Sequence, residues 1–269
     1  MKNGNLTFVG IGLYDEKDIS LKGVEEIKKC DKCYAEFYTA KLTGAEKNKI
    51  EKIVNKSIEV LSRKQTENGD VLIESAKKEK TVFLICGDSM TATTHVDLRL
   101  RAIKEGIKTK VIHGSSIVTA VPGLLGLQNY KFGRTTTIAY PEKEYFPTSQ
   151  YDVIKQNKKN GLHTLVLLDI QDDKKRYMTA NEGLNLLLKM EEKHKSALIR
   201  KDSIACVVAR AGSNEPIVRS NTIEKLKKMD FGPPLHSIVI PGNLHFMEIK
   251  ALELLAQLPA QQSRKMQKL

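Results

Sequence analysis

Short apolar runs alternate with helix-like segments through the first 113 residues of the chain. Each run has the length and composition of a buried strand, and the runs lie at residues 6–13, 33–38, 58–61, 83–86 and 108–113. The first helical segment begins after Ser20, a residue type favoured at the N-cap of a helix. Repeated strand–helix–strand units place parallel strands in one sheet with helices on both faces. The sequence therefore predicts an α/β fold whose first sheet is mostly parallel.

The apolar run at 83–86 ends abruptly at Gly87-Asp88, and small or hydroxylated residues follow. Thr93 or Thr94 is expected to cap the next helix, which is indicated by apolar residues at Val96, Leu98, Leu100 and Ile103. In open α/β sheets, ligands bind at the carboxyl ends of strands, where such loops leave backbone groups free. An ordinary strand-to-helix turn is the alternative. The loop is the first candidate for a ligand site.

The pattern changes after residue 114, and 269 residues can form two domains with separate cores. A short apolar helix, broken by Pro122-Gly123, is expected just beyond that point. We predict an N-terminal α/β domain at 1–114, an inter-domain segment at 115–134, a C-terminal α/β domain at 135–258 and a basic flexible tail at 259–269.

The chain carries 44 lysines and arginines against 32 acidic residues, a net charge of +12. These cations are spread along the chain and do not alternate with aromatic residues, which favours a solvated surface over a nucleic-acid groove. No apolar run approaches the roughly 20 residues that span a membrane. Four cysteines and no apolar N-terminal signal predict a reducing, cytoplasmic location.

Common catalytic motifs are absent from the sequence. Gly10 and Gly12 fit the first two glycines of a dinucleotide-binding fingerprint, but Asp15 stands where the third glycine is required. Cys30 and Cys33 have the spacing of a metal-ligand pair but no second pair nearby, which favours two packed cysteines over a metal site. The six histidines form no i,i+4 pair, and no nucleophile or phosphate-binding motif is present. A reaction that needs neither a protein nucleophile nor a metal is the transfer of a group between two bound molecules that the protein only has to align, for example methyl transfer from S-adenosylmethionine.

Several motifs together resemble the diphthine synthase family, of the methyltransferase class that includes the tetrapyrrole methylases. They are Gly-Asp-Ser-Met-Thr-Ala-Thr-Thr-His at 87–95, Tyr-Met-Thr-Ala-Asn-Glu at 177–182, and the segments 13–23, 209–212 and 234–236. The resemblance covers residues 6–258, and the short segment at 171–175 is similar to the archaeal form.

The resemblance implies two α/β domains with S-adenosylmethionine in the cleft between them, and a homodimer. It implies repeated methylation of the amino group on a modified histidine of translation elongation factor 2, which gives diphthine in the diphthamide pathway and releases S-adenosylhomocysteine. A tetrapyrrole methyltransferase of the same fold, or a basic RNA- or ribosome-associated binding module, is the alternative. No membrane and no direct nucleic-acid partner is expected.

Carried over by position, the resemblance implies cofactor contacts on loop ends of both domains. They are Leu13, Asp88, Thr91, Ser116, Ile117, Leu168, Ala211 and His236. A buried Asp88 would need a polar partner. His95 fits either a structural imidazole or a ligand contact, and no residue is assigned as general base.

Overall fold

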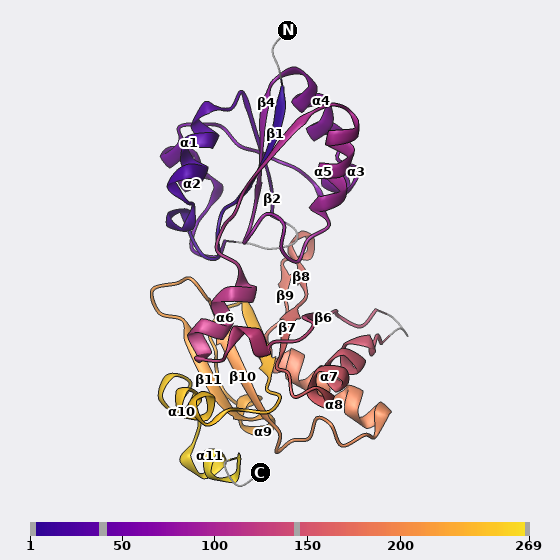
Figure 1. Ribbon diagram of the computed structural model, residues 1–269, viewed down its shortest axis with the longest axis vertical. Coiled ribbons are helices and arrows are strands. Elements are labelled where there is room, and N and C mark those ends of the chain that lie inside the picture. Colours follow the sequence, from indigo (N-terminus) through magenta and orange to yellow (C-terminus); the bar gives the residue numbers. More distant parts are fainter. Residues whose placement is uncertain (1–3, 38–41, 143–145, 267–269) are drawn as a thin grey trace. The chain divides into compact units, whose positions relative to one another are not determined.

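The structure is a computed structural model that describes residues 4–37, 42–142 and 146–266 (Figure 1). The chain forms two compact units, one of residues 1–117 with 171–175 and the other of residues 118–170 with 176–269. The segment expected to join the domains, 115–134, is thus divided between the two units. The part of the chain that is described contains no helix long and apolar enough to cross a membrane.

The first unit contains a five-stranded sheet in the order β3-β2-β4-β1-β5, and every neighbouring pair is parallel. The strands are β1 (Asn5–Gly10), β2 (Lys32–Glu36), β3 (Glu59–Val60), β4 (Lys80–Ile85) and β5 (Lys108–Ile112). The prediction of an α/β fold with a parallel first sheet is confirmed.

Helices cover both faces of this sheet (Figure 1). They are η1 (Glu16–Asp18), α1 (Leu21–Lys29), α2 (Lys47–Val54), α3 (Arg63–Asn68), α4 (Asp70–Lys78) and α5 (His95–Lys104). Alternate residues of a strand point to opposite faces, so Leu84 of β4 joins the core under α1 and α2 while Phe83 joins the core under α4 and α5. The predicted cap of α1 is confirmed, because the Ser20 hydroxyl accepts a hydrogen bond from the Gly23 amide at 3.1 Å.

Helix α5 differs from its prediction at two points. Of the four apolar residues that indicated this helix, only Leu98 is buried, whereas Val96, Leu100 and Ile103 are about half exposed. Thr94 occupies the N-cap, but its backbone is not extended (ψ 6°) and its side chain makes no capping hydrogen bond. Helix α3 was not predicted, since it is polar and buries only Thr66, although Ser62 and Gln65 form a capping box before it.

The second unit contains a five-stranded sheet in the order β11-β10-β12-β7-β6, in which only β6 and β7 pair in parallel. Its strands are β6 (Thr136–Ile138), β7 (Thr164–Leu168), β10 (Ile204–Ala209), β11 (Ile217–Thr222) and β12 (His236–Ile240). The strands β8 (Ile170–Gln171) and β9 (Arg176–Tyr177) pair separately on either side of η3 (Asp172–Lys174).

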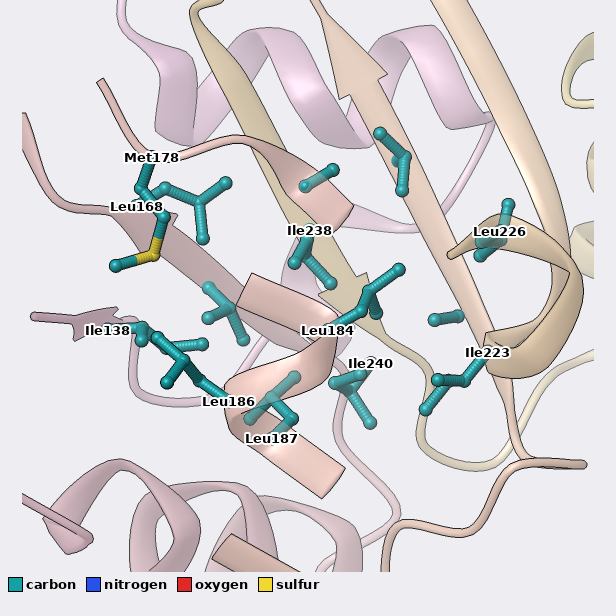
Figure 2. Close-up of a cluster of buried hydrophobic side chains, with 14 of the residues drawn as sticks. Ile138, Leu168, Met178, Leu184, Leu186, Leu187, Ile223, Leu226, Ile238 and Ile240 are labelled. Carbon is teal, nitrogen blue, oxygen red and sulfur yellow. The ribbon is translucent and has the colours of Figure 1, made fainter. Parts of the chain in front are cut away.

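The largest core cluster of the second unit packs helix α8 against this sheet (Figure 2). Thr179 and Glu182 form the capping box that begins α8. Leu184 and Leu187 of α8 are fully buried, and each contributes about 1.5–3 kcal/mol relative to an exposed side chain. The helices are α6 (Ile117–Leu125), η2 (Asn129–Lys131), α7 (Ser149–Lys159), α8 (Ala180–His194), α9 (Ile223–Leu226), α10 (Phe246–Leu255) and α11 (Ala260–Met266).

Two expectations for helices of the second unit were wrong. Helix α6 is not broken at Pro122-Gly123 but continues to Leu125. The proline removes only one amide donor from the helix, and the buried side chains of Pro122 and Leu125 hold the segment in the core. The tail expected to be flexible contains α11. Its Ser263 is buried and its hydroxyl bonds the Glu253 carboxylate of α10, a long-range contact that apolar periodicity does not reveal.

Candidate cofactor site

Three loops of the first unit meet at the carboxyl edge of the sheet. They follow β1, β4 and β5, and β1 lies between the other two strands. A Cβ atom on Gly10 would lie 2.6 Å from the Gly114 nitrogen and 2.7 Å from the Gly87 oxygen. The amides of Gly12 and Gly87 also exchange hydrogen bonds with each other's carbonyls, at 3.2 and 2.7 Å. Glycines at these positions therefore let the three loops pack backbone to backbone.

Asp88 ties the second loop to the third. Its Oδ1 accepts from the Met90 amide at 2.9 Å and the Thr91 hydroxyl at 3.1 Å. Its Oδ2 accepts from Nδ1 of His113 at 2.8 Å and from the Gly114 amide at 3.3 Å. The partner that a buried Asp88 was expected to need is thus present. These four donors occupy the lone-pair sites that a carboxylate offers.

The charge of Asp88 is stabilised by this arrangement. Burial raises the pKa of the carboxyl, but the hydrogen bonds from Met90, His113 and Thr91 outweigh it, and the pKa lies below its ordinary value. Asp88 is therefore an ionised side chain that orders the loops, and it is poorly suited to act as a general base.

The loop after β1 presents Leu13 at the same edge. Asp18 Oδ2 accepts hydrogen bonds from the amides of Leu13 at 3.1 Å and Tyr14 at 2.7 Å, which fixes the turn that begins at Gly12. The residues after β5 continue through Ser116, which is buried, to Ile117, which begins α6.

Open space remains beside Gly87. Its φ is +74°, and the nearest atom to a Cβ placed there would be the Ser115 carbonyl oxygen at 4.0 Å. By contrast, Gly10 and Gly114 have backbone in that position. The loop edge thus combines a rigid backbone with an unfilled approach at Gly87, which fits a ligand that contacts backbone groups.

The other three predicted residues lie together on the second sheet. Ala209 of β10 pairs with His236 of β12, and Ser237 pairs with Leu167 of β7. Because β12 runs antiparallel to both neighbours, its first residue lies beside the last residues of β7 and β10. The register therefore brings Leu168, Ala211 and His236 to one edge of this sheet.

His236 is held in one neutral tautomer. Its Nδ1 accepts from the Ala180 amide at 3.1 Å, so Nε2 carries the proton and donates to the Pro233 carbonyl at 3.1 Å. Burial lowers the pKa of this imidazole. The side chain of Ala211 is buried in the turn after β10, where Arg210 has a φ of 53° and donates to the Phe231 carbonyl at 2.6 Å.

Comparison with known proteins identifies the family. The family model of the tetrapyrrole (corrin/porphyrin) methylases matches residues 5–227. Diphthine synthase from Methanocella arvoryzae is 53% identical over 256 residues, which cover 94% of this chain and 98% of the relative. Diphthine synthase from Methanocaldococcus jannaschii is 54% identical over 255 residues, which cover 94% and 99%.

Solved structures agree. A crystal structure of diphthine synthase matches with a TM-score of 0.88 and 41% identity, covering 96% of this chain and 98% of that one. A putative diphthine synthase from Entamoeba histolytica matches with a TM-score of 0.87 and 36% identity, covering 95% and 100%. The chain belongs to the diphthine synthase family. Membership confirms the predicted methyltransferase class and S-adenosylmethionine as the methyl donor.

Three residues that the sequence offered as possible ligands in this diphthine synthase family member pack in the core of the first unit. His95 packs edge-on against Phe83 with ring centroids 5.2 Å apart, and burial lowers its pKa to about 4. Cys30 and Cys33 are buried free thiols of the first core, as predicted. Within the described residues, no group of three or more metal-ligating side chains is present.

Sequence reasoning missed three residues that shape the two edges. They are Asp18, which fixes the Leu13 turn, His113, which binds Asp88, and Arg210, which anchors the turn before Ala211. Of these, His113 and Arg210 carried a sequence signal, since each lies at the carboxyl end of a strand, where ligand-site residues are expected.

Proposed function

We propose that this chain repeatedly methylates the amino group on a modified histidine of translation elongation factor 2, giving diphthine in the diphthamide pathway. The support from relatives is that proteins named diphthine synthase share more than half of their residues with it over nearly their whole length. The observation in the structure that carries the proposal is the convergence of three glycine-joined loops at one sheet edge, with Asp88 bonded across two of them.

We propose that S-adenosylmethionine is bound by the residues gathered at the two sheet edges. The first unit contributes through backbone groups of the loops after β1, β4 and β5, and the second unit through the edge that contains His236. The proposed contacts are Leu13, Asp88, Thr91, Ser116, Ile117, Leu168, Ala211 and His236.

When bound, S-adenosylmethionine supplies an electrophilic methyl group on its sulfonium. The protein's own part is to position: Asp88 holds two loops in register, and neutral His236 fixes the start of β12. Because the carboxylate of Asp88 already accepts four hydrogen bonds, it does not collect the proton of the reacting amine. No protein base is assigned: the acceptor amine would react in its neutral form, and solvent would take the proton left on the nitrogen as long as the product still carries one.

The proposed partners are elongation factor 2 as substrate and a second copy of the chain in a homodimer, with no direct nucleic-acid partner and a cytoplasmic setting. A net charge of +12 suits docking to an acidic protein surface, since opposite charges speed association. Methylation rates at subsaturating substrate should then fall as salt is raised, and rates insensitive to salt would remove this role for the charge.

Mass spectrometry of elongation factor 2 tests the proposed reaction. The purified chain is incubated with S-adenosylmethionine and elongation factor that carries the modified histidine precursor, and the histidine peptide is followed over time. Successive mass increases of one methyl group each on that residue are expected, with none on factor that lacks the precursor. An unchanged peptide, or methylation of a porphyrin or corrinoid under the same conditions, would contradict the proposal.

A further inference from the structure

A cation already lies on an aromatic face in the second unit. The Arg176 guanidinium carbon is 3.4 Å from the centre of the Tyr140 ring. Tyr140 follows β6 and is buried in the core cluster, whereas Arg176, the first residue of β9, is exposed. The aromatic ring is therefore covered by a side chain that can leave for solvent.

Two carboxylates lie near Tyr140, one at its backbone and one close enough to act on its hydroxyl. The Tyr140 amide donates to Asp169 Oδ2 at 3.0 Å, and the negative charge of Glu182 adds to burial in raising the pKa of the Tyr140 hydroxyl. That hydroxyl is buried and has no hydrogen-bond partner among the residues that the structure describes. Negative charge near an aromatic face adds to its attraction for a cation, and an unpaired buried hydroxyl is a polar group whose hydrogen-bonding capacity the protein leaves unused.

The position of Tyr140 relates it to the proposed donor contacts. Strands β6 and β7 are parallel, and Ile138 pairs with Leu168 at their carboxyl ends. Tyr140 lies two residues beyond Ile138, and Asp169 directly follows Leu168. The ring and its carboxylates thus lie at the same sheet edge as Leu168.

Repeated methylation makes the acceptor increasingly suited to such a subsite. Each added methyl group removes an N–H donor, and an amine that carries three methyl groups keeps a positive charge but can donate no hydrogen bond. Aromatic faces recognise quaternary ammonium groups through cation–π attraction, which needs no donor.

We propose that Tyr140, with the charges of Asp169 and Glu182 nearby, is the subsite that holds the methylated, positively charged amine of the acceptor between successive transfers, and that this amine loses its proton to solvent before each next transfer. Arg176 covers the ring in the free protein and moves aside when the acceptor enters. This inference rests on the proposed function, and it assigns Tyr140 the role of retaining partly methylated acceptor.

The methylation states of elongation factor 2 test the subsite. In Tyr140→Leu, which removes the aromatic face, we expect singly and doubly methylated acceptor to accumulate because the later transfers slow at least about tenfold more than the first. Tyr140→Phe keeps the face and should restore most of the wild-type distribution. Arg200→Ala, at an exposed arginine paired with Asp202, is the control for surface charge and should behave as wild type.

Direct cation binding provides a second measurement that holds even if Tyr140→Leu folds poorly. Saturation-transfer NMR with tetramethylammonium should give a stronger signal for Arg176→Ala than for the wild type, since the covering cation is gone. The uncharged alcohol 3,3-dimethylbutanol, whose tert-butyl group has a similar bulk, should give no signal.

Separate outcomes distinguish the two proposals. If the wild type methylates the factor but folded Tyr140→Leu gives the same distribution of methylation states, or if Arg176→Ala does not strengthen tetramethylammonium binding, the subsite is wrong. If the wild type does not methylate the factor at all, the proposed function itself fails.

Discussion

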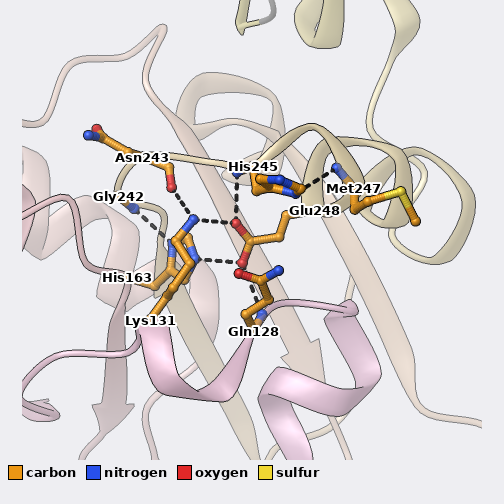
Figure 3. A network of polar contacts seen from close by, with 8 residues as sticks. All are labelled: Gln128, Lys131, His163, Gly242, Asn243, His245, Met247 and Glu248. Carbon is orange, nitrogen blue, oxygen red and sulfur yellow. Dashed lines mark hydrogen bonds and ion pairs between the residues drawn. The ribbon is translucent and has the colours of Figure 1, made fainter.

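Nε2 of His163 donates a hydrogen bond to Glu248 Oε1 at 3.0 Å, although the two residues are 85 positions apart in the chain (Figure 3). The direction is set by Nδ1 of His163, which accepts from the Gly242 amide at 3.0 Å. The other oxygen of Glu248 accepts from Lys131 Nζ at 2.6 Å. One buried carboxylate of α10 therefore connects η2 with the residue that directly precedes β7 in the second unit.

Substitution Glu248→Gln should destabilise the protein. It removes the negative charge beside Lys131, and breaking a buried ion pair by removing one partner costs about 3 kcal/mol. Chemical denaturation monitored by circular dichroism would measure the loss. Lys250→Gln, on the exposed side of the same helix, is the matched control and should change the free energy of unfolding by less than about 0.5 kcal/mol. Equal stability of Glu248→Gln and wild type would contradict this role.

Acid should remove the same contribution. Although burial raises the pKa of Glu248, hydrogen bonds from Lys131, His245 and Gln128 lower it to about 2, below the ordinary value near 4.5. A lowered pKa gives stability that is present above about 4.5 and is lost as the pH falls towards 2. The stability difference between wild type and Glu248→Gln should therefore shrink across that range. A difference that stays constant from pH 6 to about 2.5 would be inconsistent with an ionised Glu248 in the folded state.

Gly87 and Gly106 form a matched pair for the cofactor site. Both have a φ of +74°, so alanine at either position should cost about 1 kcal/mol of backbone strain. Gly106 follows α5 in open space, whereas Gly87 lies in the converging loops, where a bound ligand would meet the new methyl group. Isothermal titration should show S-adenosylhomocysteine binding weakened at least about tenfold in Gly87→Ala and unchanged in Gly106→Ala. Equal binding by the two variants would place the ligand away from Gly87.

The four free thiols should resist modification in the folded protein. All four are buried. Burial raises the pKa of Cys206 to about 12, and it raises the pKa of Cys86 further still. Cys30 differs, because a hydrogen bond with Cys33 lowers its pKa. A thiol-reactive dye should therefore label Cys30 first and slowly, and rapid labelling of Cys86 or Cys206 without denaturant would be contrary to this packing.

Local signals predicted the elements that form the first sheet. Apolar runs bounded by glycine, together with the cap at Ser20, are sufficient to predict strand–helix–strand units and thus parallel pairing. The exposed side of α5 was not predictable in this way. Val96, Leu100 and Ile103 are as apolar as Leu98, and which of them is buried depends on which side of the helix packs against the sheet.

The site was predictable in part for a related reason. Strand ends locate the loops, so the neighbourhood of Asp88 could be found without a structure. The partners of Asp88 could not be predicted, because His113 is 25 residues away in the chain. The strand register that brings Leu168 and His236 to one edge could not be predicted either. These contacts depend on which strands become neighbours, and that order is a property of the whole sheet.

Calorimetric titration with S-adenosylhomocysteine tests most directly the claim that the loops around Asp88 bind the methyl donor. The wild type should bind in the micromolar range. Asp88→Ala, which frees His113, Thr91 and two amides, should bind at least about tenfold more weakly. Asp202→Ala, at an exposed aspartate, serves as the control. Wild-type affinity in a folded Asp88→Ala variant, or no binding by the wild type, would contradict the account.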